Sequence, residues 1–234
     1  MTSLIVLLGY MGCGKTKVGK KLSKKIGAKF IDLDFEIEDY YSKSINQRLF
    51  LINLLNMASL IVLLGYMGCG KTKVGKKLSK KIGAKFIDLD SEIEDYYSKS
   101  INQIFEECGE IRFRQIERKI LLNILNRNEY SVLSLGGGTP CYFNNMEKIN
   151  KKTKLTFFLN LDSKALAERL FTRKEKRPLL ASIQDKNEMI AYVNKHLFER
   201  KNYYLKATHT VNSKEKNITI VCKKILSVLE KNSS

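Results

Sequence analysis

The chain carries two nearly identical copies of one long segment. At an offset of 56 residues, residues 1–47 align with residues 57–103, and only two of the 47 aligned pairs differ. Repeat architectures stack several diverged units, so a near-identical unit that is present twice does not indicate a solenoid. The repeat indicates a recent tandem duplication, an artificial fusion or a gene whose limits were misassigned.

Residues 57–234 alternate between strand and helix patterns. The unbroken apolar run at residues 60–64 is typical of a strand buried on both faces of a parallel sheet. Helical periodicity over residues 71–82 ends at Gly83, which is placed as a C-terminal stop. Further strands are predicted at 86–90, 132–135, 155–159 and 208–211, and further helices at 91–107, 111–125, 163–171, 183–202 and 217–230. The alternation predicts an α/β sandwich whose ligands gather at the carboxyl ends of parallel strands.

Such a sheet has one central strand position, for which the two copies compete. Loop closure entropy grows slowly with length, so the extra 56 residues cost the first copy on the order of 1 kcal/mol. Only the second copy continues into a chain of single-domain length. We therefore expect residues 57–234 to form one complete domain and residues 1–56 to be a poorly packed appendage. The chain is expected to be a monomer, with a swapped dimer through the duplicated segment as the alternative.

Composition excludes several classes of protein. A hydrophobic content of 44% argues against disorder, and the net charge of +18 comes mainly from lysines spread along helical stretches. This distribution favours a solvated basic surface over a nucleic-acid site. The five cysteines form no CxxC pair, and their odd number favours reduced thiols in a cytoplasmic protein. No apolar run is long enough for a membrane span, so we expect no membrane partner. Because the lysines are dispersed, we expect no nucleic-acid partner either.

A glycine loop follows the first strand of the second copy. Residues 65–72 read GYMGCGKT, which fits G-x-x-x-x-G-K-[ST] between a strand and a helix. Backbone N–H groups of such a loop surround phosphates, Lys71 reaches the β- and γ-phosphates, and the Thr72 hydroxyl can bind Mg²⁺. The loop therefore predicts a nucleotide phosphate site. Its expected ATP contacts are Gly68, Cys69, Gly70, Lys71, Thr72 and Lys73.

Two acids, Asp88 and Asp90, end the second predicted strand. On a strand, residues two apart point to the same face, here at the edge beside the glycine loop. One acid could then lie near the water shell of a metal ion while the other accepts a proton from the attacking hydroxyl. Alternatively, the acids cap the helix expected to begin near Ser91.

Three more features of the second half carry chemistry. Gly136, Gly137 and Gly138 directly follow a buried strand and allow the backbone to approach a small ligand closely. The basic run 173–177 could be a solvated loop or a flap that closes over ATP. Arg114 and Arg200 are two of only nine arginines in a lysine-rich chain, which suits bidentate binding of a carboxylate or a phosphate.

These motifs, in this order, resemble the shikimate kinase family over essentially all of residues 57–234. The resemblance rests on the glycine loop, Asp88-x-Asp90, Ile104-Phe105, Gly109-Glu110-x-x-Phe113-Arg114-x-x-Glu117, Leu135-Gly136-Gly137-Gly138, Lys176-Arg177-Pro178-Leu179-Leu180, and Arg200 with Tyr204. It implies a nucleoside-monophosphate-kinase-like P-loop fold, a three-layer α/β sandwich with a five-stranded parallel sheet in the order 2-3-1-4-5. It also implies Mg²⁺- and ATP-dependent phosphorylation of the 3-hydroxyl of shikimate, a step toward chorismate and the aromatic amino acids.

Carried over by position, the resemblance also assigns a role to each site residue. Shikimate would be held by Asp90, Arg114, Gly136, Gly137, Gly138 and Arg200. The two arginines would bind its carboxylate, and Asp90 would bind its ring hydroxyls and act as the base. Lys71 and Arg177 would stabilise the transferring phosphoryl group, and Arg177 would also contact ATP. Thr72 would bind Mg²⁺ directly, and Asp88 through water.

Two other functions remain open from the sequence. Another small-metabolite kinase of the same fold, such as a gluconate-type kinase, would share the phosphate loop but would give no reason for Arg114 and Arg200. An inactive P-loop protein or a basic nucleic-acid binder is the more distant alternative. The acceptor that supports ADP release distinguishes the kinases, and a steep salt dependence of nucleic-acid affinity would indicate the binder.

Overall fold

The structure, a computed structural model, describes residues 5, 7, 14–28, 30–32, 60–172, 180, 182–213 and 217–231. Its contacts divide the chain into two compact units, Met1–Phe50 and Leu51–Ser234.

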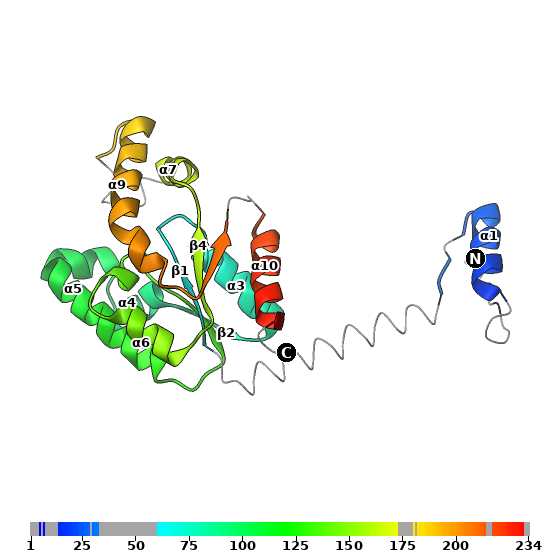
Figure 1. Ribbon diagram of the computed structural model, residues 1–234, viewed down its shortest axis with the longest axis horizontal. Helices are drawn as coiled ribbons and strands as arrows, with labels where there is room; N and C mark the ends of the chain where they lie inside the picture. Colours follow the sequence, from blue (N-terminus) through cyan, green and yellow to red (C-terminus); the bar gives the residue numbers. More distant parts are fainter. Residues whose placement is uncertain are drawn as a thin grey trace. The chain divides into compact units, whose positions relative to one another are not determined.

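The second unit is built on a five-stranded parallel sheet (Figure 1). Its strands are β1 (Leu60–Leu64), β2 (Lys85–Asp88), β3 (Ser131–Ser134), β4 (Thr156–Asn160) and β5 (His209–Asn212). The spatial order is β2-β3-β1-β4-β5, and every neighbouring pair is parallel. The predicted fold class and strand order are confirmed. All five residues of β1 are buried, as expected for the central strand of a sheet covered on both faces.

Helices cover both faces of this sheet. They are α3 (Lys71–Ile82), α4 (Leu89–Tyr97), α5 (Ile101–Leu125), α6 (Asn145–Lys152), α7 (Ser163–Phe171), α9 (Lys186–Tyr204) and α10 (Ile218–Lys231), with a short 3₁₀ turn, η1, at Thr139–Cys141. In Figure 1, α3 and α10 lie on one side of the sheet, and α4, α5 and α6 lie on the other. Because all five strands are parallel, their carboxyl ends lie at one edge of the sheet, where the loops of the site gather.

The predicted helix 91–107 is wrong, because the chain breaks it. Asp88 caps α4 by accepting a hydrogen bond from the backbone N–H of Asp90, so the helix begins two residues before Ser91. Helix α4 then stops at Ser98, which has a φ of 51°. Ser100 begins α5 with a capping box that it shares with Gln103. The turn η1 and helix α6 were not predicted.

The first unit repeats the local structure of the second copy. Helix α1 (Lys15–Ile26) has the same twelve residues as α3, and each helix ends at a left-handed glycine, with a φ of 66° at Gly27 and 67° at Gly83. The hydroxyl of Thr16 donates to Asp32 over 2.9 Å, as that of Thr72 does to Asp88 over 3.0 Å. The helix and its end are therefore specified locally in both copies.

Side-chain burial separates the two helices. Val74 and Ile82 of α3 are 2% and 1% exposed, whereas their equivalents in α1, Val18 and Ile26, are 54% and 51% exposed. Helix α3 packs on β1, β2, β3 and α10, which bury its apolar face. The same amphipathic helix thus has its core partners in one copy and leaves these two side chains exposed in the other.

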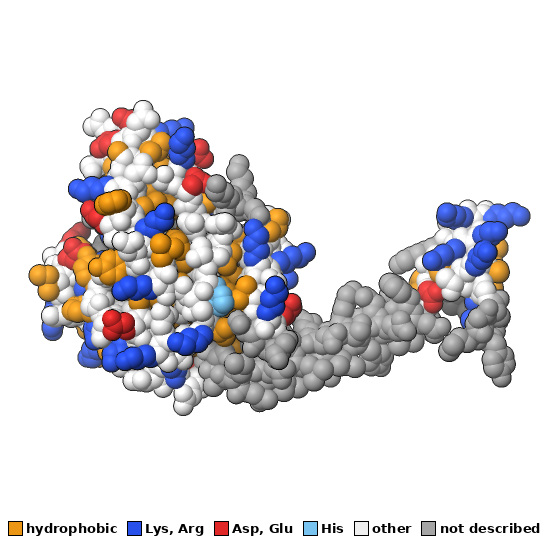
Figure 2. All heavy atoms as spheres, viewed as in Figure 1, with side chains coloured by type: hydrophobic (Ala, Val, Ile, Leu, Met, Phe, Trp, Pro, Cys, Tyr) orange, Lys and Arg blue, Asp and Glu red, His pale blue; other side chains and the backbone are white. Residues whose placement is uncertain are grey.

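The surface of the second unit carries many basic side chains. Figure 2 shows Lys and Arg scattered among apolar and uncharged groups on the visible face of this unit. This dispersed arrangement is typical of a solvated lysine-rich surface. No described helix is long and apolar enough to cross a lipid bilayer.

Candidate active site

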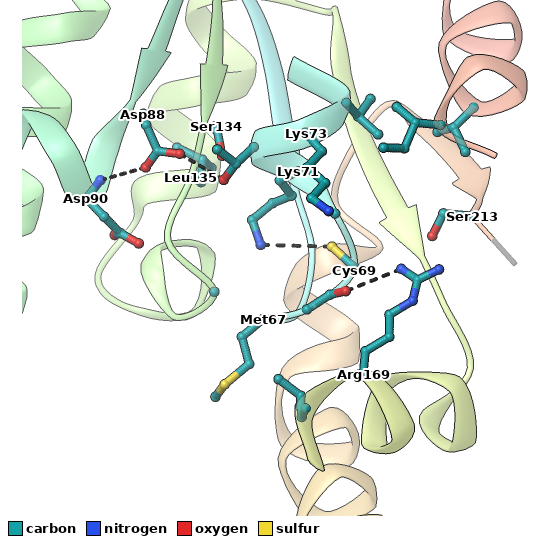
Figure 3. A pocket seen from close by; sticks show the side chains of 18 of the residues that line it. Met67, Cys69, Lys71, Lys73, Asp88, Asp90, Ser134, Leu135, Arg169 and Ser213 are labelled. Carbon is teal, nitrogen blue, oxygen red and sulfur yellow. Dashed lines mark hydrogen bonds between the residues drawn. The ribbon is translucent and has the colours of Figure 1, made fainter. Parts of the chain in front are cut away.

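The glycine loop connects the end of β1 to the start of α3 and lines a cavity of about 630 Å³ (Figure 3). Gly65, Gly68 and Gly70 have φ angles of 140°, 83° and 103°, which only glycine adopts without strain. Lys71 is 8% exposed, and its Nζ donates to the carbonyl oxygens of Gly65 (2.8 Å) and Tyr66 (3.2 Å). These contacts hold its ammonium group at the loop.

The cavity at the glycine loop gathers all six residues expected to contact ATP there. Its lining includes Gly68, Cys69, Gly70, Lys71, Thr72 and Lys73. Arg169 of α7 lines the same cavity, and its Nη1 donates to the carbonyl oxygen of Gly68 over 3.4 Å. Figure 3 shows Arg169 and Ser213 on the side of the cavity away from Asp88 and Asp90. Arg169 was not among the predicted site residues, although arginines are rare in this chain and that rarity was a usable signal.

Thr72, Asp88 and Asp90 meet at the end of β2. The Thr72 hydroxyl donates to Asp88 Oδ2 over 3.0 Å, and Asp88 Oδ1 accepts from the backbone N–H of Asp90 over 3.2 Å. Asp88 therefore caps α4, as the alternative prediction has it, and it also accepts a hydrogen bond from Thr72 at the end of the phosphate loop. The expectation that both acids lie on a strand is wrong, because Asp90 lies in the first turn of α4. A carboxylate is favourable there because the helix dipole is positive at its N-terminus.

The carboxyl group of Asp90 lies in an unusual electrostatic environment. Shielding from water and, to a smaller extent, the negative charges of Asp88 and Glu117 together raise the pKa of Asp90 to about 6, against the lowering effect of Lys71. The residue as a whole is exposed, and it lines the cavity. A carboxyl group with a pKa near neutrality can both accept and release a proton, as general-base catalysis requires.

A second cavity of about 290 Å³ adjoins the first. The two share Met67, Asp90 and Gly137 in their linings. The second cavity also contains every residue expected to bind the acceptor: Asp90, Arg114, Gly136, Gly137, Gly138 and Arg200. Asp90 therefore stands between a cavity built around a phosphate loop and a cavity walled by two arginines.

Gly136, Gly137 and Gly138 have neighbours so close that a side chain at any of them would meet another part of the site. A Cβ on Gly136 would lie 2.9 Å from Asp90 Oδ1, and one on Gly138 would lie 2.5 Å from Arg114 Nη2. A Cβ on Gly137 would lie 3.3 Å from the backbone nitrogen of Met67 in the phosphate loop. Each glycine thus leaves room for a different part of the site to approach closely.

The side chain of Arg114 is largely shielded from water, and its guanidinium group has only part of its possible hydrogen bonds. Its side chain is 11% exposed, and its Nη1 donates to Glu117 Oε2 over 2.9 Å. Its Nε has no hydrogen-bond partner among the described residues, and the nearby Glu110 Oε1 is 3.6 Å away. A buried guanidinium N–H without a partner suits an anionic ligand that would complete its hydrogen bonds.

Glu117 holds this arginine in place. The residue is 1% exposed, and its second oxygen accepts from the hydroxyl of Thr139 over 2.7 Å. Glu117 belongs to one of the family motifs, but no role was predicted for it. Its spacing of three residues from Arg114 on a helix was the signal that the two side chains meet.

On the other wall, Arg200 projects from α9. One turn further along the helix, the hydroxyl of Tyr204 donates to the carbonyl oxygen of Gly137 over 2.6 Å. Electrostatic interactions with Tyr204, Cys141 and Tyr66 raise the pKa of Arg200 against the lowering effect of its burial, so it remains a cation. Arg177, the remaining predicted catalytic residue, lies outside the described residues.

The family model described as "Shikimate kinase" matches residues 11–51 and 67–230 of the chain. A protein named shikimate kinase from Flavobacterium psychrophilum is 41% identical over 169 residues, which cover 72% of the chain and 98% of that protein. A second, from Flavobacterium johnsoniae, is 42% identical with the same coverage.

Solved structures give the same picture. The chain resembles a shikimate kinase from Bacteroides thetaiotaomicron with a TM-score of 0.69 and 36% identity, covering 73% of the chain and 98% of that structure. It resembles a shikimate kinase from Acinetobacter baumannii, solved in complex with shikimate, with a TM-score of 0.66 and 30% identity over 74% and 93% of the two chains. A gluconokinase from Sinorhizobium meliloti shares 16% identity at a TM-score of 0.51 over 76% and 94%, a likeness of fold alone.

Proposed function

The chain belongs to the shikimate kinase family and phosphorylates shikimate, and we propose that its two adjoining cavities hold the phosphoryl donor and the acceptor of that reaction. ATP would place its phosphates in the cavity at the glycine loop, and shikimate would occupy the arginine-walled cavity with its 3-hydroxyl toward Asp90. The observation that carries this assignment is that Asp90 lines both cavities. A base in that position can take the proton of the hydroxyl as the phosphoryl group is transferred.

Arg114 and Arg200 are proposed to bind the carboxylate of shikimate. Arg114 is supported by its buried Nε without a hydrogen-bond partner among the described residues. Arg200 is supported by its place in the same cavity, where it is half-buried. Two guanidinium groups in one cavity would fix the ring of the acceptor and turn a particular hydroxyl toward the donor. Gluconate also carries a carboxylate, but its open chain would not hold a hydroxyl at the same place as the shikimate ring does, which favours shikimate over gluconate.

Lys71 is proposed to stabilise the transferring phosphoryl group, and Arg177 to assist it and to contact ATP. Support for Lys71 comes from its place at the start of α3, within the lining of the donor cavity. The role of Arg177 rests on the sequence motif and the family. Fixed positive groups aimed at the phosphoryl oxygens lower the barrier because charge accumulates there in the transition state.

The residues present fit Mg²⁺ as the cofactor. The Thr72 hydroxyl and the Asp88 carboxylate lie together and offer hard oxygen ligands, which Mg²⁺ prefers. The described residues contain no cluster of three or more acidic, His or Cys ligands, so phosphates and waters would complete the coordination. When bound, Mg²⁺ would neutralise phosphate charge. Thr72 would ligate it, and Asp88 would hold one of its waters.

Residues 57–234 are proposed to be the working domain, and residues 1–56 an appendage. This is supported by the central strand β1, which comes from the second copy, and by the exposure of Val18 and Ile26 in α1. We propose that the protein is a monomer with no nucleic-acid or membrane partner. It would work in the cytoplasm, where its cysteines remain reduced. A dimer that exchanges the duplicated segment is the alternative assembly, and a native mass measurement separates the two.

A coupled ADP-release assay tests the function. Shikimate should support turnover, whereas gluconate and nucleoside monophosphates should not. Replacement of Arg114 by Lys keeps the charge but loses the bidentate fork, so it should raise the KM for shikimate by about tenfold or more. The same replacement at Arg112, on the same helix and exposed, is the matched control. ATP binding without turnover on any acceptor would instead indicate an inactive P-loop protein.

A further inference from the structure

Helix α9 presents one face to the acceptor cavity at four-residue intervals. Tyr192, His196 and Arg200 lie one turn apart on this face, and all three line the cavity. The ring of Tyr192 packs against that of His196 with a centroid distance of 4.2 Å. The face therefore carries more than Arg200, and the roles so far assigned leave His196 without a function.

His196 is joined to the phosphate loop. The hydroxyl of Tyr66, the second residue of that loop, lies 3.2 Å from His196 Nδ1. Tyr66 is 1% exposed, so its hydroxyl needs a hydrogen-bond partner within the protein. The backbone carbonyl of the same residue accepts from Lys71 Nζ over 3.2 Å. One residue thus touches the catalytic lysine through its backbone and helix α9 through its side chain.

A second tie lies one helical turn beyond Arg200. Tyr204 donates from its hydroxyl to the carbonyl oxygen of Gly137, and Gly137 packs on the backbone of the phosphate loop. Arg200 therefore sits midway between two points at which α9 is fastened. Its guanidinium carbon also lies 5.8 Å from the centre of the Tyr66 ring, within the range of a cation–π interaction.

We propose that Tyr66 and His196 are positioning residues that hold Arg200 toward the carboxylate of the acceptor. The hydrogen bond between them fixes the rotation of α9 against the phosphate loop, and the Tyr66 ring supports the guanidinium group from below. The inference rests on the proposed role of the acceptor cavity. Burial and the charge of Arg200 both lower the pKa of His196, so the imidazole is neutral at pH 7 and adds no second cation beside Arg200.

The arrangement has a consequence for substrate affinity. Without the hydrogen bond, Arg200 would keep its charge, but its side chain would no longer be held in one direction. Binding of the carboxylate would then have to immobilise the Arg200 side chain, which costs free energy. The loss of affinity should be confined to shikimate. The contact of Lys71 with Tyr66 uses the backbone carbonyl of Tyr66, so changes in the Tyr66 side chain leave it in place. We therefore expect an effect on shikimate binding and little effect on ATP.

The test compares shikimate affinity, by calorimetry and as KM, in the full chain and in variants. Tyr66→Phe removes only the hydroxyl, and His196→Leu removes the ring nitrogen. Each should weaken shikimate binding about three- to tenfold, the range of one hydrogen bond, with the KM for ATP within about twofold. The double variant should bind no more weakly than either single variant, because both remove the same bond.

Rescue and control variants separate positioning from general damage. His196→Asn, whose side-chain amide can accept or donate near the position of Nδ1, should restore most of the affinity. Tyr203→Phe, on the same helix but outside the cavity, should change nothing. Unchanged affinity in Tyr66→Phe and His196→Leu, multiplied losses in the double variant, or no rescue by asparagine would overturn the inference. Failure of the unaltered protein to bind shikimate would overturn the proposed function instead.

Discussion

The guanidinium group of Arg114 donates a hydrogen bond to the carboxylate of Glu117 over 2.9 Å, and the side chains are 11% and 1% exposed. The pair links the substrate wall to the protein interior, because the other oxygen of Glu117 is held by Thr139. Removal of either charge would leave the other one buried and uncompensated.

Glu117→Ala should therefore destabilise the domain by about 3 kcal/mol and also weaken shikimate binding. Urea unfolding and shikimate titration measure the two effects. Glu110, on the same helix and near the same arginine, has a side chain that is 49% exposed. Its replacement by Ala should cost less than about 1 kcal/mol. An equal loss of unfolding free energy in the two variants would contradict the prediction that the buried pair of Arg114 and Glu117 contributes more than the exposed Glu110.

Lys71 and Lys15 are equivalent residues of the two copies, and they test which copy works. Lys71→Ala should lower kcat by about a hundredfold or more, since one fixed donor to the developing charge is lost. Lys15→Ala should leave the steady-state kinetics unchanged. The reverse result would mean that the first copy fills the sheet. Partial losses in both variants would mean that the copies share the central position.

Ile82 and Ile26 provide the corresponding test of stability. Ile82 is 1% exposed, and its replacement by Ala should cost about 2–5 kcal/mol because it empties part of the core. Ile26 is 51% exposed, and the same replacement should change the unfolding free energy by less than about 0.5 kcal/mol. Chemical denaturation of the full chain measures both. A large cost at Ile26 would contradict the assignment of residues 1–56 as an appendage.

The raised pKa of Asp90 predicts opposite pH trends for activity and stability. The base must be ionised, so kcat/KM for shikimate should rise as the pH rises through about 6. Folding raises this pKa from 3.8, so the folded chain binds the proton more tightly. The contribution of Asp90 to stability is thus greatest at low pH and is lost as the pH rises from about 4 to 6.

A pH–rate profile and unfolding curves at several pH values measure the two trends. In Asp90→Asn, activity should fall at least a hundredfold, and the part of the stability trend due to this carboxyl group should disappear. A wild-type rate that stays constant between pH 5 and 7 would exclude Asp90 as the base.

Gly138→Ala should damage the acceptor side alone. The added Cβ would lie 2.5 Å from Arg114 Nη2, so the guanidinium group must move. The KM for shikimate should rise about tenfold or more while the KM for ATP stays within about twofold, as steady-state kinetics with each substrate varied would show. A parallel rise in both constants would indicate a general distortion of the site.

The fold and much of the site could be predicted because their signals are local or periodic. The apolar run of β1, the glycine loop and the stop at Gly83 each depend on a few adjacent residues, and α1 shows that the last of these persists without core packing. The break at Ser98 was missed because periodicity continues across it. The role of Asp88 as a cap shifted Asp90 from a strand to a helix, which residue type alone did not reveal.

Contacts between distant segments could not be predicted. The approach of Arg169 to Gly68 joins residues 101 positions apart, and that of His196 to Tyr66 joins residues 130 positions apart. Nothing in either segment marks its partner. Such pairings follow from the strand order, which brings the segments after β1 and β4 to one edge of the sheet.

The strand register also bears on the order in which this chain folds. Leu60 pairs with Ser131, 71 residues further along the chain, whereas the matching residue of the first copy would have to span 56 residues more. Closing the shorter loop is faster, and synthesis completes the second copy just before its sheet partners emerge. We therefore expect the duplicate to lose the competition for the sheet during biosynthesis, by timing as well as by equilibrium.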